Sequence, residues 1–257
     1  MNNIRTNSLD PIEIENWRWK PFLDIAIKKL SSFPLDSYQI PSDFLDRDTL
    51  LGSKMNPLLV RTSTWACKTE KIRQARAACV QAKDIASVLN LVISPNVNFD
   101  LPFFGVDFVT LPAYHLLALD FQPVLQDDAK HTNNVWSRLM PLHEKWQSQL
   151  PSGGEIPSQA KKYFSPALLW TKIPIGVEGE KVISEIIKPA FFEYISLYFD
   201  LIVNAMEVSN ERSLLLLSGQ KNYMKYRADN DPARSMFNKF YGSEWTDQYI
   251  HQVLFDL

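Results

Sequence analysis

The chain is poor in the residues from which the commonest catalytic motifs are built. It holds only 8 glycines, 4 histidines and 2 cysteines in 257 residues. No Gly-x-Gly-x-x-Gly, Gly-x-x-x-x-Gly-Lys-Ser/Thr, His-Glu-x-x-His or Gly-x-Ser-x-Gly motif occurs, so the usual dinucleotide, nucleoside triphosphate, zinc-protease and serine-hydrolase sites are not expected. The histidines lack metal-ligand spacing, and we assign no role to any of them: His115, His131, His143 and His251.

The sequence also shows no feature that directs export or membrane insertion. Cys67 and Cys79 have neither zinc or redox spacing nor the density of a disulfide scaffold, which favours reduced thiols. The first residues, MNNIRTNSLDPIEIENW, contain no apolar signal core. The most hydrophobic segment, residues 182–208, is interrupted by charges and a proline, which predicts a buried, kinked helix and not a membrane span. We therefore expect a cytoplasmic protein without a membrane partner.

Charge is nearly balanced, with 27 Lys and Arg against 29 Asp and Glu and a formal net charge of -2. No overall basic field therefore argues for a nucleic-acid partner. A hydrophobic content of 46% with 12% aromatic residues is typical of a globular chain that can bury a sizeable core. Repeats and linker-like stretches are missing from the sequence, so we expect one domain over residues 1–257, acting as a monomer.

The first half of the chain changes from helical to strand-like spacing. Residues 17–32 place apolar side chains at helical intervals, and the next stretch, to about residue 55, has the polar and Pro/Gly composition of a long connecting loop. Residues 57–123 are a series of short runs rich in Val, Ile, Thr and Phe, with gaps too short for crossover helices. This texture predicts an antiparallel meander.

After residue 130 the apolar spacing is again helical. A Gly- and Pro-rich loop at residues 151–166 and a short strand at residues 168–175 interrupt it. Strands in the middle of the chain, with helices before and after, predict an α+β fold in which helices cover the faces of one antiparallel sheet.

A basic cluster lies within the strand region, in CKTEKIRQAR. If this run is a strand, Lys71 and Arg73 project from one face and Arg76 from the other. Such cations can hold ligand carboxylates or dock an acidic protein, and arginine is well suited to bidentate carboxylate binding. The alternative is a solvated face of an edge strand.

Three further polar residues stand in apolar surroundings. Asn90 shares a strand face with two valines, as either a core amide with hydrogen-bond partners or a ligand-facing amide would. Asp107 lies within DLPFFGVDFVTL, where a carboxylate must end a strand, meet a cation or face a polar cavity. Asp231 directly precedes Pro232 at an apparent helix start, the pattern of an N-cap. Local pattern leaves a structural and a functional interpretation open for all three residues.

Five stretches, in this order along the chain, resemble the ferredoxin-dependent bilin reductases: TWACKTEKIRQARAACV, DLPFFGVDFVTLPA, LLALDFQP, NDPARSMF and GSEWTDQYIHQVLFDL. The similarity runs from about Asp10 to the last residue. It implies a three-layer α/β/α sandwich, whose central antiparallel sheet and flanking helices enclose an open-chain tetrapyrrole. The resemblance also implies no bound flavin or metal. Reduced ferredoxin would deliver electrons one at a time, the bilin would pass through radical states, and protein groups would supply protons.

By this resemblance, Asp107 and Asp231 are the candidate proton donors. A carboxyl in a mostly apolar pocket has its pKa raised by desolvation, which keeps it protonated and able to act as an acid. Asp107 would also accept hydrogen bonds from pyrrole N–H groups. Gly105 would make room for a flat ligand between flanking phenylalanines.

The sequence departs from family members that make phycocyanobilin at two positions, Asn90 in place of histidine and Ala78 in place of glutamate. With both aspartates kept, the resemblance implies two-electron reduction of 15,16-dihydrobiliverdin at its A-ring diene to phycoerythrobilin. The alternatives are reduction of biliverdin to 15,16-dihydrobiliverdin and a bilin carrier or lyase that performs no reduction.

The implied partners are 15,16-dihydrobiliverdin, ferredoxin and, as a further candidate, the reductase that supplies the substrate. Bilin propionates need cations and ferredoxins are acidic, so the basic cluster acquires two competing uses. We expect Lys71, Arg73 and Arg76 to bind substrate carboxylates or to form the docking surface, with Asn90 as a further substrate-binding residue.

Overall fold

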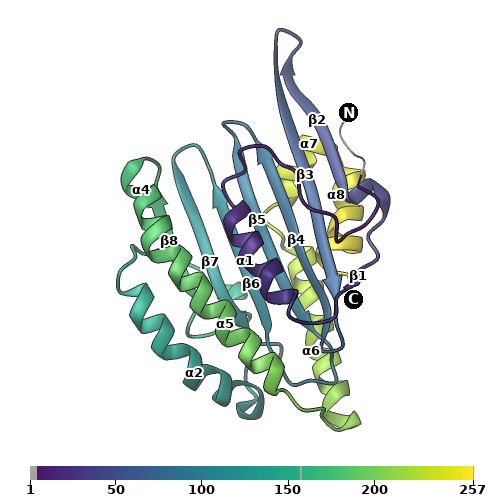
Figure 1. Ribbon diagram of the computed structural model, residues 1–257, viewed down its shortest axis with the longest axis vertical. Coiled ribbons are helices and arrows are strands. Elements are labelled where there is room, and N and C mark those ends of the chain that lie inside the picture. The colour runs from purple at the N-terminus through teal and green to yellow at the C-terminus, as the bar shows by residue number, and fades with distance from the viewer. Residues whose placement is uncertain (1–4, 157, 257) are drawn as a thin grey trace.

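The computed structural model describes residues 5–156 and 158–256 and centres on an eight-stranded sheet (Figure 1). All strand pairs are antiparallel, and the order is β1-β3-β4-β5-β6-β7-β8, with β2 pairing β3 next to β1. The strands are β1 (Asp36–Ser37), β2 (Asp46–Ser53), β3 (Asn56–Lys68), β4 (Ile72–Ala82), β5 (Ala86–Pro95), β6 (Phe103–Thr110), β7 (Tyr114–Gln122) and β8 (Leu169–Pro174). The antiparallel meander expected at residues 57–123 and the short strand after it are confirmed.

Helices cover both faces of the sheet (Figure 1). One layer contains α1 (Lys20–Leu30), α2 (Ala129–Gln147), α4 (Val177–Val182) and α5 (Lys188–Asn204), and the other contains α6 (Asn210–Asp229), α7 (Arg234–Tyr241) and α8 (Ser243–Tyr249). The shorter helical segments are η1 (Ser42–Phe44), α3 (Ser158–Lys161), η2 (Ile183–Ile187) and η3 (Ile250–Leu254). The expected three-layer α/β/α sandwich is confirmed.

Each helical layer makes its own hydrophobic core with one face of the sheet. On the face under α1 and α5, the core includes Phe104 and Phe108 of β6. On the face under α6, α7 and α8, it includes Val88 of β5 and Phe103 of β6. Because side chains alternate between faces, central strands covered on both sides must be apolar almost throughout. A polar residue at such a position therefore needs a partner within the fold.

The helix expected at residues 182–208 runs from Val177 to Asn204 through α4, η2 and α5, so it begins and ends earlier than expected. Pro189 stands in the first turn of α5, directly after the π-helical turn η2. A proline inside a helix lacks an N–H and crowds the carbonyl four residues earlier, and a wider turn at this place relieves that conflict. α5 thus continues across the sheet despite the proline.

The long loop expected up to residue 55 is wrong. Residues 46–53 form β2, which pairs along its whole length with β3 and joins it through a turn at residues 54–55. β2 is mostly exposed, so it carries little of the apolar alternation by which a strand is identified in a sequence.

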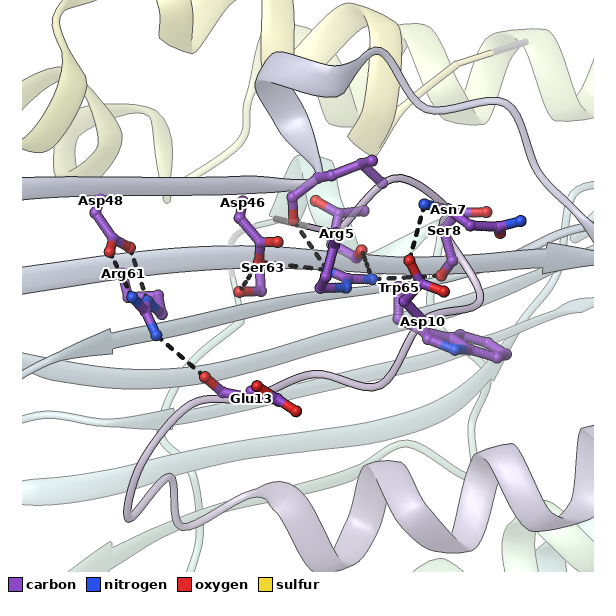
Figure 2. Close-up of polar contacts among 12 residues, drawn as sticks. Arg5, Asn7, Ser8, Asp10, Glu13, Asp46, Asp48, Arg61, Ser63 and Trp65 are labelled. Atoms are coloured by element: carbon purple, nitrogen blue, oxygen red, sulfur yellow. Dashed lines mark hydrogen bonds and ion pairs between the residues drawn. The ribbon is translucent and has the colours of Figure 1, made fainter. Parts of the chain in front are cut away.

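An N-terminal arm, residues 5–8, lies along the edge of β3 between β2 and β1. The Ser8 carbonyl accepts the backbone N–H of Ala66 at 3.0 Å, and Arg5 donates to the Thr64 carbonyl at 2.9 Å. Figure 2 shows Arg5 beside Asp46, whose carboxylate also accepts a hydrogen bond from Ser63 at 2.5 Å. The arm therefore occupies polar backbone groups that an edge strand would otherwise leave open.

Candidate active site

Several polar residues singled out in the sequence meet on the sheet face that lies under α6. The register places Asn90 of β5 opposite Asp107 of β6, Asp107 opposite Ala118 of β7, and Ala118 opposite Trp170 of β8. Residues paired in this way project to the same side of a sheet. All four are half-buried, so they form one partly open row across four strands.

A second row lies beside the first and completes a surface that we call the open floor. It contains Val109 of β6 and Leu116 of β7, which are paired and half-buried. The open floor therefore consists of Asn90, Asp107, Val109, Leu116, Ala118 and Trp170. An apolar surface with one carboxylate near its middle suits a flat, largely apolar ligand that also carries hydrogen-bond donors.

Asp107 meets a cation, one of the three solutions expected for a carboxylate at its position. Its Oδ1 accepts a hydrogen bond from the Asn90 side-chain amide, and its Oδ2 lies 3.5 Å from Nη2 of Arg227 in α6. The Asp107 side chain is 40% exposed, which weakens the ion pair through solvent screening. The same exposure leaves the carboxyl accessible to a ligand on the open floor.

Arg76 binds the side chain of Asn90, which in turn binds the Asp107 carboxylate. Its Nη1 donates to the Asn90 Oδ1 at 2.5 Å, and its Nε donates to the Leu254 carbonyl at 3.1 Å. The guanidinium is buried, and this burial lowers its pKa to about 10. Asn90 is thus fixed in one orientation, with its carbonyl toward Arg76 and its NH₂ toward Asp107.

Arg227 connects Asp107 to a second chain of hydrogen bonds. Its Nη1 donates to the Tyr223 hydroxyl at 3.2 Å, and that hydroxyl donates to Oε1 of Gln122 in β7. Burial opposes the positive charge of Arg227, but Tyr223 and the carboxylates of Asp107 and Asp231 outweigh it and raise its pKa. Arg227 therefore remains a fixed positive charge next to the open floor.

Asp231 follows α6 and lies within electrostatic range of Arg227 and Asp107. Burial raises its pKa, although Arg227 and a backbone hydrogen bond oppose the rise. The expected N-cap is wrong in detail, because α7 starts at Arg234 with Ala233 as its N-cap. Asp231 instead accepts the backbone N–H of Ala233 at 2.7 Å, two residues on, in a turn before the helix.

Lys71 and Arg73 do not reach the open floor. The Lys71 ammonium donates to three carbonyls at the end of α5, and Arg73 donates to the Tyr38 hydroxyl and the Asp256 carbonyl. The two residues therefore serve opposite layers, and the prediction that they share a strand face is wrong. β4 starts only at Ile72, and its register shifts before Gln74.

Gly105 has a different role from the one expected. A Cβ at this position would lie 2.7 Å from Oε1 of Gln122, so the missing side chain makes room for Gln122 and not directly for a ligand. The neighbouring phenylalanines lie on opposite faces of the sheet. Phe104 packs in the core under α5, while Phe103 packs on Tyr223 at 4.7 Å between ring centroids.

Pattern reasoning missed Tyr223, Arg227, Gln122 and Asp120, which the structure adds to the surroundings of the open floor. The first two had a detectable signal, because Tyr223, Arg227 and Asp231 follow at intervals of four, the spacing of one helix face. Gln122 and Asp120 had a weaker one, as polar residues two apart in an apolar strand. Their partners lie in distant segments, so local pattern could not name them.

Two general features of the described chain bear on its chemistry. Within residues 5–156 and 158–256, three or more His, Cys, Asp or Glu side chains are nowhere grouped so that they could hold a metal ion. Among the helices formed by these residues, none is both long and apolar enough to cross a membrane.

Comparison with known proteins places this geometry in a family. The family model described as ferredoxin-dependent bilin reductase matches residues 23–256. A protein of Prochlorococcus marinus (strain MIT 9211) named phycoerythrobilin:ferredoxin oxidoreductase is 59% identical over the full length of both chains. A protein of Synechococcus sp. (strain RCC307) with the same name is 57% identical over 100% of this chain and 98% of its own.

A solved structure shares the fold. The crystal structure of selenomethionine phytochromobilin synthase from tomato in complex with biliverdin superposes with a TM-score of 0.81, covering 92% of this chain and 82% of that one at 22% identity. Taken with the family match, the chain belongs to the ferredoxin-dependent bilin reductases, enzymes that reduce a bilin with electrons from ferredoxin.

Proposed function

We propose that this chain reduces 15,16-dihydrobiliverdin at the A-ring diene to phycoerythrobilin, with Asp107 and Asp231 as the proton donors. The observation that carries the proposal is the position of Asp107 on the open floor, with Asp231 electrostatically coupled to it beside Arg227. The names of the full-length relatives, phycoerythrobilin:ferredoxin oxidoreductase, support the choice of product.

The proposed reaction balances with the groups present. Two reduced ferredoxins each give one electron, and the bilin takes up two protons, so that one carbon–carbon double bond of the diene system is removed. The bilin is a radical after the first electron. Asp231 releases the proton that it holds and regains it from solvent, whereas Asp107 first takes up a proton from solvent through its exposed side and then passes it to the reduced bilin.

Ala78 and Asn90, the two positions at which the chain differs from family members that make phycocyanobilin, lie in line with Asp107 and support the choice of reaction. Ala78 of β4 pairs with Asn90, which pairs with Asp107. Neither alanine nor asparagine releases a proton at physiological pH, so this row offers one acidic group, Asp107. With Asp231 the site holds two proton donors, the number that a two-electron, two-proton reduction requires.

The raised pKa of Asp231 fits the role of an acid. Burial disfavours its charged form, so a larger fraction stays protonated at a given pH than for an exposed aspartate. Arg227 would hold the carboxylate left after transfer, because a fixed cation stabilises a developing negative charge.

An anaerobic conversion assay tests the proposal. The chain is mixed with ferredoxin, ferredoxin reductase and NADPH, with either biliverdin or 15,16-dihydrobiliverdin, and the products are separated by chromatography. We expect phycoerythrobilin from 15,16-dihydrobiliverdin and no product from biliverdin. Conversion of biliverdin to 15,16-dihydrobiliverdin would contradict the proposed substrate. A bound bilin that never changes oxidation state would instead indicate a carrier.

A further inference from the structure

Asp120 is a buried carboxyl on the same sheet face as the open floor, and the proposed chemistry does not use it. It lies on β7 two residues beyond Ala118 and is 1% exposed. Its Oδ2 accepts the backbone N–H of Ser165 at 2.8 Å, and its Oδ1 accepts the Ser165 hydroxyl at 2.5 Å. Both oxygens thus bind one residue of a segment far away in the sequence.

Ser165 belongs to what we call the covering segment, residues 158–168, which precedes β8. Within this segment, Tyr163 stacks on Tyr226 of α6 with 4.3 Å between ring centroids and meets Tyr223 edge-on at 5.5 Å. Tyr223 is the residue whose hydroxyl binds Arg227. The covering segment therefore spans from β7 to α6 and adjoins the hydrogen-bond chain that ends at Asp107.

The covering segment borders an open hollow where Asp120 binds it. Phe164, Ser165 and Pro166 border a hollow of about 510 Å³, with Trp170 among its other lining residues. A hollow deprives its lining of packing contacts, so hydrogen bonds contribute a larger share of what fixes the backbone there. The Tyr194 hydroxyl adds one at 3.2 Å, to the carbonyl of Ala167.

We propose that Asp120 is a positioning residue for bilin binding: by fixing Ser165, it sets the covering segment so that Tyr163 stands against Tyr223 and Tyr226 beside the open floor. Asp120 does not touch the reacting atoms, because it is enclosed under Ser165. Loss of the Asp120–Ser165 hydrogen bonds is expected to let the covering segment shift toward the hollow. This shift would enlarge the bilin site and weaken the contact of Tyr163 with Tyr223. This inference rests on the proposed bilin site on the open floor.

Paired variants in the full chain test the inference. Asp120→Asn keeps the size of the side chain but has one acceptor oxygen in place of two, and Ser165→Ala removes the hydroxyl donor. Biliverdin and 15,16-dihydrobiliverdin are titrated by visible absorbance under anaerobic conditions without ferredoxin. We expect each variant to raise the Kd of the bound bilin roughly tenfold, the effect of one lost hydrogen bond.

Three further readouts separate positioning from a general loss of structure. The double variant is expected to bind no more weakly than either single variant, because both changes break the same tie. The kcat at saturating bilin is expected to change less than about twofold while KM rises, since Asp120 acts on binding and not on proton transfer. The visible band of the bound bilin is expected to shift. Additive losses in the double variant, or wild-type Kd in Ser165→Ala, would overturn the inference.

Two control variants complete the experiment. Ser63→Ala removes a similar serine-to-carboxylate hydrogen bond, from the Ser63 hydroxyl to Asp46 at 2.5 Å (Figure 2), and is expected to leave the bilin Kd unchanged. Ala118→Phe fills the open floor and is expected to abolish binding. Normal binding in Ala118→Phe would remove the proposed site and the inference with it. Lost binding there, with normal binding in the Asp120 and Ser165 variants, would overturn the inference alone.

Discussion

At the scale of single residues, the carboxyl of Asp107 illustrates how a charge is accommodated in an apolar strand. Its two oxygens are divided between the Asn90 amide and the Arg227 guanidinium, and the side chain keeps an exposed side. The same three features that stabilise the residue without ligand leave it in contact with whatever occupies the open floor. Structural and catalytic roles are therefore compatible at this position.

Asp107→Asn is expected to bind bilin but to stall during reduction. The amide keeps the shape of the site and has no acidic proton to transfer, so the rate is expected to fall at least about 100-fold. Single-turnover reduction followed by electron paramagnetic resonance should detect an accumulated bilin radical. Asp84→Asn, in the turn between β4 and β5 where the backbone φ is +60°, is a matched control because asparagine tolerates that conformation. A normal rate in Asp107→Asn would contradict its assignment as a donor.

Asp231→Asn is expected to lose activity while retaining stability. Asparagine Oδ1 can still accept the Ala233 N–H, so the turn before α7 is kept and the Tm should change little. In the wild type, the rate should fall as pH rises through the raised pKa of Asp231, because only the protonated form donates. The measurements are kcat against pH and the Tm of both proteins. A lower Tm with an unchanged rate would restore a purely structural role.

Asp120 is expected to make the stability of the fold depend on pH. Burial raises its pKa to about 7 from the ordinary aspartate value of 3.8. Between these values the folded state binds more protons than the unfolded state, so the free energy of unfolding falls as pH rises from about 4 to about 7. The loss is on the order of a few kcal/mol and ends above the folded pKa.

Denaturant unfolding at pH 5 and pH 8 measures this effect. Taken as the difference between wild type and Asp120→Asn, the free energy of unfolding should change in favour of the variant as pH rises. A difference that stays constant across this range would show that the carboxyl of Asp120 is not perturbed in the fold.

At the scale of elements, the helices and the central strands follow from their periodicity, whereas β2 does not. The helix at Lys20–Leu30 buries the residues expected at helical spacing, including Phe22 and Ala26. β2 is mostly polar and mostly exposed, so its pairing with β3 is what makes it a strand. Sequence patterns report burial, and an element that buries little leaves little pattern.

Lys71 belongs to this scale, because its ammonium satisfies carbonyls at the C-terminus of α5. Lys71→Met is expected to lower the free energy of unfolding by about 1–2 kcal/mol, since three carbonyls and the negative end of the helix dipole lose their cation. Bilin Kd and the KM for ferredoxin should stay unchanged. Lys68→Met, a neighbouring exposed position, is the control. A raised KM for ferredoxin with normal stability would return Lys71 to the docking surface.

At the scale of the whole molecule, segments distant in sequence close the sheet edge and build the site. The edge of β3 is shared by β2, the N-terminal arm and β1. The site face combines four neighbouring strands with the end of α6 and the covering segment, which is held by Asp120.

The N-terminal arm allows a test of how independent edge and site are. Arg5→Ala is expected to lower the free energy of unfolding by about 2 kcal/mol, because its buried guanidinium holds the carbonyls of Leu45 and Thr64. Bilin reduction should continue at the wild-type rate. Arg61→Ala, which breaks a more exposed pair with Asp48, should cost less than about 1 kcal/mol. A reduced rate in a stable Arg5→Ala protein would show coupling between edge and site.

The sequence by itself determined the order of the helices and the central strands and, through the family stretches, the three-layer fold and the two candidate aspartates, because periodicity and the family stretches are local in the chain. Only the tertiary structure decided how the polar residues are used. It paired Asp107 with Arg227, turned Lys71 and Arg73 to the helix end and the C-terminal segment, and filled the space beside Gly105 with Gln122. These contacts join residues up to 183 positions apart, and strand register and helix packing, which no local pattern encodes, bring them together.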